Sequence, residues 1–349
     1  MRADRRAALA ALFLLCLGKA ACAEGFAGLG DGAAGFEAVV PGKPLSFPKD
    51  FGAHPAFRIE WWYLTVNLTG EDGARYGAQW TLFRNAMEPN PERPGWADRT
   101  LYMAHAALTS ATEHLVAEDF ARGGVGQAGV TAEPFEAFID DWSFAAQADG
   151  RYLATAKGAE FSYALGLRAE GPLVLHGDAG YSRKSEQGQA SYYFSQPFFA
   201  VDGVVRLHGR AVKVTGRGWM DREWSSQPLS PDQKGWDWFA LHLPRGERLM
   251  LYRFRGAKTS FAGTWIGADG ATRSLSGADI TLTPLETARL AERDVPIRWR
   301  VEVASLRLAI ETAPLNPNSW MATRFPYWEG PISFQGSHAG EGYLEMTGY

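Results

Sequence analysis

The chain has 349 residues, 13% of them aromatic, with 39 Gly and a formal net charge of −4. A slightly acidic chain without a basic run lacks the positive surface that nucleic acids attract, so we expect no nucleic-acid partner. Many aromatic and Gly residues without a long amphipathic helical pattern indicate short strands joined by turns, and therefore an all-β protein.

Residues 1–23 have the three parts of a signal peptide. Three Arg residues precede an apolar run, and a small-residue cleavage signal ends at Ala23. We predict cleavage before Glu24 and a periplasmic or secreted protein that keeps no membrane span. The alternative is a lipoprotein anchored at Cys22, which is disfavoured because Lys19 stands where an apolar residue is needed. Both Cys residues lie in this segment, so the mature chain is expected to have no disulfide.

After an extended arm at 24–49, strands are predicted from residue 58 onward. Aromatic and β-branched residues at 60–68 are followed by Asp72-Gly73, a hairpin turn signal, and by a return strand at 75–84. A two-residue turn at this position places Trp61 opposite Arg84 and Trp62 opposite Phe83. Seven more strand patterns are predicted at 99–109, 114–120, 135–146, 151–156, 159–168, 190–200 and 204–215.

A Trp-rich segment joins the two halves of the chain. Four of the 13 Trp residues lie within 219–238, interleaved with acidic residues. Strand alternation places Trp219, Asp221 and Glu223 on one face, and Met220, Arg222 and Trp224 on the other.

The two halves have similar patterns. Residues 236–239 and 249–255 resemble 60–63 and 79–84, and the segment from Gly216 to Asp221 matches the segment from Gly340 to Glu345. This repetition predicts two tandem antiparallel β-barrels, the first at 50–228 and the second at 229–349.

In the second half, Arg245-Gly246 is the predicted hairpin turn. A two-residue turn there places Asp237 opposite Phe254 and makes Tyr252 its diagonal neighbour. An acid beside a phenol on an apolar face is a candidate catalytic pair. A buried structural acid satisfied by backbone N–H groups is the alternative interpretation.

Four separated segments resemble one known family. Residues 57–63, 219–226, 235–239 and 327–348 are similar to those of the AttH/CrtC-type lipocalin-like proteins, whose members are labelled carotenoid 1,2-hydratase or predicted secreted hydrolase. The resemblance covers nearly the whole mature chain. It implies lipocalin-like (calycin) barrels, a hydrophobic lipid or isoprenoid ligand, and an ABC-type transporter as a possible partner.

Two functions are therefore open. One is a periplasmic binding module for a hydrophobic ligand. The other is a hydro-lyase or hydrolase that adds water to such a ligand, which requires a carboxyl kept protonated in an apolar pocket and aromatic faces to stabilise a cation. An apolar cavity without a proton donor is expected for the binding module, and a carboxyl with a raised pKa for the enzyme.

No metal site is expected because the His residues lack metal-ligand spacing, and no cofactor is expected because the sequence has no P-loop or dinucleotide fingerprint. The candidate residues fall into three groups. The predicted catalytic residues are Asp237, Tyr252 and Asp221. The predicted ligand-binding residues are Trp219, Trp236, Trp238, Phe239 and His242. The residues predicted to be structural are Trp61, Trp62, Arg84, Glu60, Arg222, Glu223 and Trp224.

Structural alternatives accompany these predictions. Trp61 or Trp62 with Arg84 or Arg58 fits the Trp–Arg plug of lipocalin-type barrels. The alternative role for Asp221, Arg222 and Glu223 is an ion-pair cluster that joins the two barrels. For His242 it is packing or hydrogen bonding.

Overall fold

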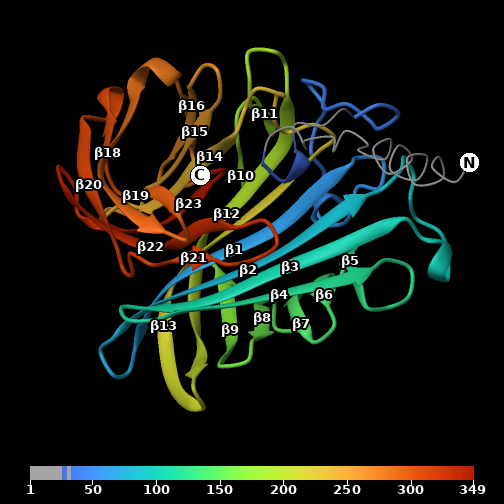
Figure 1. Cartoon of the computed structure of the whole chain (residues 1–349), viewed down its shortest axis with the longest axis horizontal. Coiled ribbons are helices and arrows are strands. Elements are labelled where there is room, and N and C mark those ends of the chain that lie inside the picture. Colours follow the sequence, from blue (N-terminus) through green and yellow to red (C-terminus); the bar gives the residue numbers. More distant parts are fainter. Residues whose placement is uncertain (1–25, 30–32) are drawn as a thin grey trace, which may run out of the picture.

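The computed structural model describes residues 26–29 and 33–349, so the predicted signal peptide and Cys22 lie outside the described residues. The described chain is almost entirely β-structure in two antiparallel sheets, one forming a nearly closed barrel and the other a half-barrel (Figure 1). The predicted all-β class and the pair of lipocalin-like barrels are confirmed. Within the described ranges, no helix is long and apolar enough to cross a membrane.

The first sheet has 13 strands and ends at Ser225. Its strands are β1 (Ile59–Gly70), β2 (Arg75–Ala86), β3 (Thr100–Ser110), β4 (His114–Arg122), β5 (Ala128–Ala132), β6 (Phe135–Ile139), β7 (Trp142–Ala146), β8 (Tyr152–Lys157), β9 (Phe161–Ala169), β10 (Val174–Leu175), β11 (Tyr181–Arg183), β12 (Ala190–Leu207) and β13 (Arg210–Ser225).

The second sheet has ten strands and begins at Gly235. Its strands are β14 (Gly235–His242), β15 (Arg248–Arg255), β16 (Ser260–Ile266), β17 (Thr272–Leu275), β18 (Ile280–Leu290), β19 (Arg293–Val303), β20 (Leu308–Pro314), β21 (Trp320–Met321), β22 (Tyr327–Gly336) and β23 (Gly340–Thr347). The short 3-10 turns are η1 (Phe26–Gly28), η2 (Lys49–Phe51), η3 (Gly95–Ala97), η4 (Gly277–Asp279) and η5 (Ala304–Leu306).

Both sheets pair their opening strand with their closing strand. In the first sheet β1 pairs with β13, and in the second β14 pairs with β23. Figure 1 shows the two sheets side by side, with β22 and β23 next to β1 and β2. At this contact Gly77 of β2 lies against Pro331 of β22, so closely that a Cβ on Gly77 would sit 2.5 Å from the proline Cγ. The repeated pattern in the sequence therefore corresponds to a repeated strand arrangement.

Both predicted hairpin registers were wrong by one residue. Trp61 is opposite Phe83 and Trp62 is opposite Leu82, whereas Asp237 is opposite Arg253. The reason is the same in both hairpins, because each loop has three residues rather than two and ends in a Gly with positive φ, Gly73 at 77° and Gly246 at 93°. A three-residue loop with a left-handed last residue shifts the pairing by one position.

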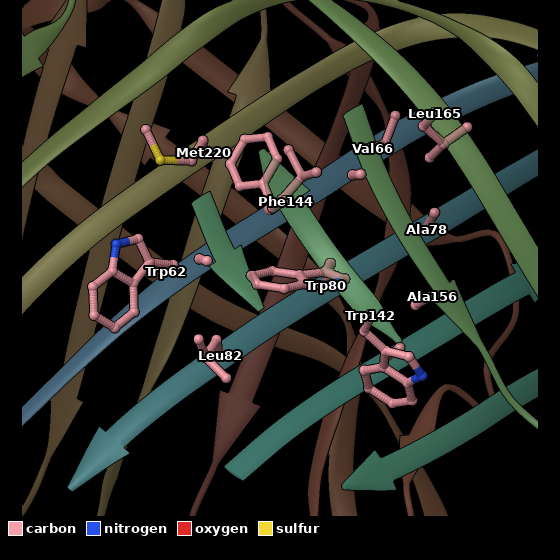
Figure 2. Close-up of a cluster of buried hydrophobic side chains, with 14 of the residues drawn as sticks. Trp62, Val66, Ala78, Trp80, Leu82, Trp142, Phe144, Ala156, Leu165 and Met220 are labelled. Atoms are coloured by element: carbon pink, nitrogen blue, oxygen red, sulfur yellow. The ribbon is translucent and has the colours of Figure 1, made fainter. Parts of the chain in front are cut away.

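The interior of the first sheet is packed with large apolar side chains. Figure 2 shows Trp62, Trp80, Trp142, Phe144 and neighbouring aliphatic residues filling the space between strands. The predicted Trp–Arg plug exists with a different arginine, because the guanidinium of Arg222 lies 3.9 Å above the ring of Trp62. Arg222 stacks there because it is the cross-strand partner of Trp62 on β13.

A buried ion cluster surrounds Glu60 of β1. Glu60 pairs with Arg84 (Oε1 to Nη1, 3.0 Å) and with Arg222, and His54 donates its backbone N–H to the same carboxylate. Burial alone would raise the pKa of Glu60, but Arg222, His54 and Arg84 together hold it well below its ordinary value. His54 also stacks on Trp224 with ring centroids 3.9 Å apart. Five of the residues predicted to be structural are therefore linked in one network with His54, namely Glu60, Trp62, Arg84, Arg222 and Trp224.

The cluster gives a stability prediction. Glu60→Gln leaves two buried guanidinium groups without their counter-charge, and we expect the free energy of unfolding to fall by about 3–5 kcal/mol. The matched control is Glu286→Gln, which removes the exposed partner of Arg298 and should change stability by less than about 1 kcal/mol. Urea unfolding of both variants provides the measurement. Equal effects in the two variants would contradict the structural role of the Glu60 cluster.

Candidate functional site

A cavity of about 380 Å³, partly open to solvent beside the exposed residues Leu101 and Phe120, lies between the two sheets. Its walls are mostly apolar and include Trp61 of β1, Phe83 of β2 and Met103 of β3 on one side, and Trp238 of β14 and Tyr252 of β15 on the other. The size and lining suit a small hydrophobic molecule.

Asp221 is one of the few charged groups that line this cavity. Its Oδ1 accepts hydrogen bonds from Ser195 Oγ and from Trp219 Nε1 (2.6 Å), and its Oδ2 accepts one from the Tyr193 hydroxyl (2.8 Å). Burial raises the pKa of Asp221 to about 7, even though these three hydrogen bonds favour the charged form. The predicted catalytic residue Asp221 is therefore a carboxyl that can both give and take a proton near neutral pH.

Glu345 of β23 lines the same cavity and has a similar pKa. Burial raises the pKa of Glu345 to about 7, against hydrogen bonds from Trp236 and Tyr63, and the charge of Asp221 adds to the increase. Glu345 is the residue that matches Asp221 in the repeated sequence pattern. The two repeats thus each supply one acid to the space between them.

Tyr63 connects the acids across the interface. It is the cross-strand neighbour of Asp221, while its hydroxyl donates to Oε1 of Glu329 at 2.5 Å and also bonds Glu345. Glu329 is directly opposite Glu345 on β22. Burial and the nearby charge of Glu345 raise the pKa of Glu329 well above its ordinary value, so this carboxyl keeps its proton.

His105 lies at the β3 side of the cavity. Its Nδ1 is 3.0 Å from the Tyr327 hydroxyl, and its Nε2 is 3.1 Å from Oε1 of Glu118. Burial lowers the pKa of His105 despite the hydrogen bond to Glu118. The imidazole is therefore a neutral polar group on the cavity wall near pH 7.

The structure places Asp237 outside the cavity lining. Asp237 is fully buried, and its carboxylate pairs with Arg253 (Oδ2 to Nε, 2.5 Å) and with Arg255. The same carboxylate accepts a hydrogen bond from the Tyr349 hydroxyl at 2.7 Å. The observed register puts Tyr252 opposite Trp238, so Asp237 and Tyr252 point to opposite faces of the sheet. The predicted Asp237–Tyr252 pair therefore does not form.

The predicted ligand-binding residues are divided between the cavity and its surroundings. Trp236 and Trp238 line the cavity, together with Tyr252. Trp219 is buried behind Asp221 as its hydrogen-bond donor, and His242 packs against Trp219 with ring centroids 6.1 Å apart. Phe239 points into the core of the second sheet, where its ring meets Trp299 edge to face.

The three adjacent charged residues of β13 have separate partners in the described chain. Asp221 binds uncharged donors, Arg222 points to the opposite face toward Glu60, and Glu223 pairs with Lys184 at 2.7 Å. They do not form the ion-pair cluster between barrels that the sequence suggested as an alternative. Trp61, expected to be structural, is a wall of the cavity.

Sequence reasoning missed Tyr63, His105, Tyr327, Glu329 and Glu345 as site residues. Only Glu345 carried a usable signal, because it is the repeat counterpart of Asp221. The others reach the site through packing between sheets, which strand patterns do not specify. In the part of the chain that the structure describes, no group of three His, Cys, Asp or Glu residues could hold a metal ion.

The raised pKa of Asp221 predicts a dependence of stability on pH. An acid with a folded pKa of about 7 and an unfolded value near 3.8 binds more protons in the folded state between these limits. Its contribution to stability is therefore lost as pH rises from about 4 to 7, by up to a few kcal/mol. Asp221→Asn removes this contribution, so the stability of the variant relative to wild type should increase over that range. Urea unfolding at pH 4.5, 6 and 8 tests this, and parallel stability curves for the two proteins would contradict the raised pKa.

Comparison with known proteins agrees with this architecture. The family model described as AttH-like matches residues 38–349. A crystal structure of an AttH protein from Nitrosomonas europaea is similar over 90% of this chain and 99% of that chain, with 35% identity and a TM-score of 0.81. Kievitone hydratase from Nectria haematococca has a similar fold, with 16% identity, 90% and 96% coverage and a TM-score of 0.66. No curated protein sequence matches significantly. The chain belongs to the AttH-like family.

Proposed function

We propose that the protein is a hydratase-type enzyme that adds water to, or removes water from, a carbon–carbon double bond in a small hydrophobic molecule. The observation that carries this proposal is the pair of cavity carboxyls, Asp221 and Glu345, whose pKa values burial raises to about 7. An inert binding cavity needs no such groups, because burying an acid without a salt-bridge partner lowers stability.

Asp221 is the proposed general acid. In its protonated form it transfers a proton to an alkene carbon and leaves a carbocation on the ligand. The faces of Trp238, Tyr252 and Trp61, which line the cavity, can stabilise that positive charge. A ligand that fills the mostly apolar cavity displaces water from its walls, so the cation survives until a held water attacks it.

Glu345 is the proposed general base. In its ionised form it accepts the proton of the attacking water, while Tyr63 bridges toward Glu329 and fixes the position of the acids. Two coupled carboxyls with similar pKa values are poised to hold one proton between them. At neutral pH the site then contains one acid and one base, and the reverse sequence performs dehydration.

The hydratase structure among the comparisons indicates that a protein of this fold is named for such a reaction. Kievitone hydratase is named for adding water, and its fold similarity spans nearly the whole of both chains. At 16% identity the likeness extends to the fold alone, so the argument for chemistry rests on the cavity acids of this chain.

A carrier role is the second candidate. The mostly apolar cavity of about 380 Å³ would also hold a lipid or isoprenoid molecule without reaction. The leader-like residues 1–23 support a location outside the cytoplasm for either function.

The test uses farnesol, whose trisubstituted alkenes give tertiary cations on protonation. We expect farnesol to bind wild-type protein and to quench the fluorescence of the cavity Trp residues. In H₂¹⁸O the protein should convert farnesol to an ¹⁸O-labelled alcohol, which mass spectrometry detects. Asp221→Asn and Glu345→Gln should each lower kcat about 10²–10⁴-fold, as expected for loss of a general acid or base.

Two further variants make this result specific. Glu286→Gln changes an exposed carboxylate on β18 and serves as the matched control. Asp237→Asn separates the two acid assignments, because a comparable loss of kcat in a folded Asp237→Asn protein would return the acid role to Asp237. Binding of farnesol without any labelled product would favour the carrier instead.

A further inference from the structure

A chain of hydrogen-bonding side chains leads from Asp221 away from the ligand cavity. Ser195 of β12 is the cross-strand partner of Asp221, and its hydroxyl donates to Oδ1 of that carboxyl. The same Ser195 hydroxyl lies 2.7 Å from Nε2 of His176. Neither Ser195 nor His176 belongs to the cavity lining.

His176 lies between β10 and β11, and contacts of its ring and its backbone fix its position. Its ring stacks on Tyr193 with centroids 4.1 Å apart, and its backbone N–H donates to the Tyr193 carbonyl at 3.1 Å. Its Nδ1 is 2.9 Å from the hydroxyl of Thr264 on β16, in the second sheet. Both ring nitrogens therefore face hydroxyl groups, which can donate or accept.

The end of this hydrogen-bonded series that is remote from Asp221 reaches a second pocket, on the outer surface of the protein. His176 and Thr264 contribute to its wall, together with the exposed residues Asp178, Arg183 and Ser274. The volume of this outer pocket is about 590 Å³. Thr264, His176 and Ser195 thus span the distance between a solvent-facing pocket and the buried acid.

We propose that Thr264, His176 and Ser195 form a proton relay that exchanges protons between the outer pocket and Asp221. The relay rests on the proposed function, because an apolar ligand that fills the cavity would block the direct route of water to Asp221. After Asp221 has protonated the ligand and Glu345 has taken the proton of the attacking water, the relay returns a proton to Asp221. Glu345 releases its proton to solvent when the product leaves the cavity, so one proton enters and one leaves in each turnover.

The relay balances without any additional group. With Asp221 ionised, Nε2–H of His176 donates to Ser195, and the Ser195 hydroxyl donates to Asp221. A proton that arrives from water through the Thr264 hydroxyl binds Nδ1, the Nε2 proton moves to Ser195, and the Ser195 proton moves to Asp221. The relay now runs in the opposite sense, with Asp221 donating to Ser195, Ser195 to Nε2, and Nδ1–H to Thr264. Protonation of Asp221 is thereby coupled to a change of tautomer at His176.

The charged surroundings favour a neutral imidazole throughout. Burial lowers the pKa of His176 to about 3, and the cationic Lys184 on the segment after β11 adds to this effect. Lys184 is paired with Glu223 of β13, and the charge of Glu223 adds to the raised pKa of Asp221. From the second sheet, Glu345 of β23 interacts electrostatically with Asp221. A histidine that resists becoming a cation passes a proton by exchanging tautomers.

The test measures the tautomer directly and needs no substrate. In ¹⁵N-histidine-labelled full-length protein, NMR shifts of Nδ1 and Nε2 should show His176 as the Nε2–H form at pH 9 and the Nδ1–H form at pH 5. The midpoint should coincide with the titration of the Asp221 carboxyl, followed by ¹³C labelling. A tautomer that stays constant in wild-type protein while Asp221 titrates would overturn the relay.

Variants then identify the connecting residue. Ser195→Ala should abolish the pH-dependent tautomer change, and Asp221→Asn should fix one tautomer at all pH values. The matched control is Ser191→Ala, which removes another buried hydroxyl of β12 that donates to Glu223 instead, and the tautomer change should persist. A change that persists in folded Ser195→Ala would also refute the relay. Because no turnover is measured, an intact tautomer change without farnesol hydration would reject the proposed function and keep the relay.

Discussion

At the junction of the two sheets, β1 and the end of β13 from Gly218 to Ser225 are mostly buried on both faces. Side chains alternate along each strand, so successive residues point into the first barrel and into the cavity between the sheets. Along β1, Glu60 and Trp62 enter the first barrel, while Trp61 and Tyr63 face the cavity. Along β13, Arg222 and Trp224 enter the barrel, while Asp221 faces the cavity. A buried ion-pair network and the wall of the cavity are thus built from alternate residues of the same two strands.

The acids at this junction show how partners decide the effect of burial. Glu60 and Asp221 are both shielded from water, yet Glu60 stays ionised because two guanidinium groups surround it. Asp221 receives only uncharged donors, and these do not offset the loss of solvation. The two acids are equally buried but behave differently. Glu60 stays ionised inside the first barrel, whereas Asp221 can gain or lose a proton near neutral pH beside the cavity.

Much of this organisation could be predicted from sequence alone. The alternation of Trp219 and Asp221 against Met220, Arg222 and Trp224 specified the faces of β13, and the repeated Gly-x-Gly pattern specified related halves. Cross-strand partners could not be predicted equally well, because the three-residue loops ending in Gly73 and Gly246 shift each register by one residue. That shift removes Tyr252 from the face of Asp237. The contacts of Tyr63 with Glu329 and of His105 with Tyr327 join residues more than 200 positions apart, and local sequence patterns carry no information about them.

Gly77 and Pro331 bring β2 and β22 to nearly their minimum separation at one end of the junction. Any larger residue at position 77 would act as a wedge and tilt one sheet away from the other, widening the space between them without altering an acid or an aromatic wall. The spacing of the two sheets therefore depends on a contact between residues outside the cavity lining. A related chain with a larger residue at this contact would have more widely spaced sheets and the same side chains around the cavity.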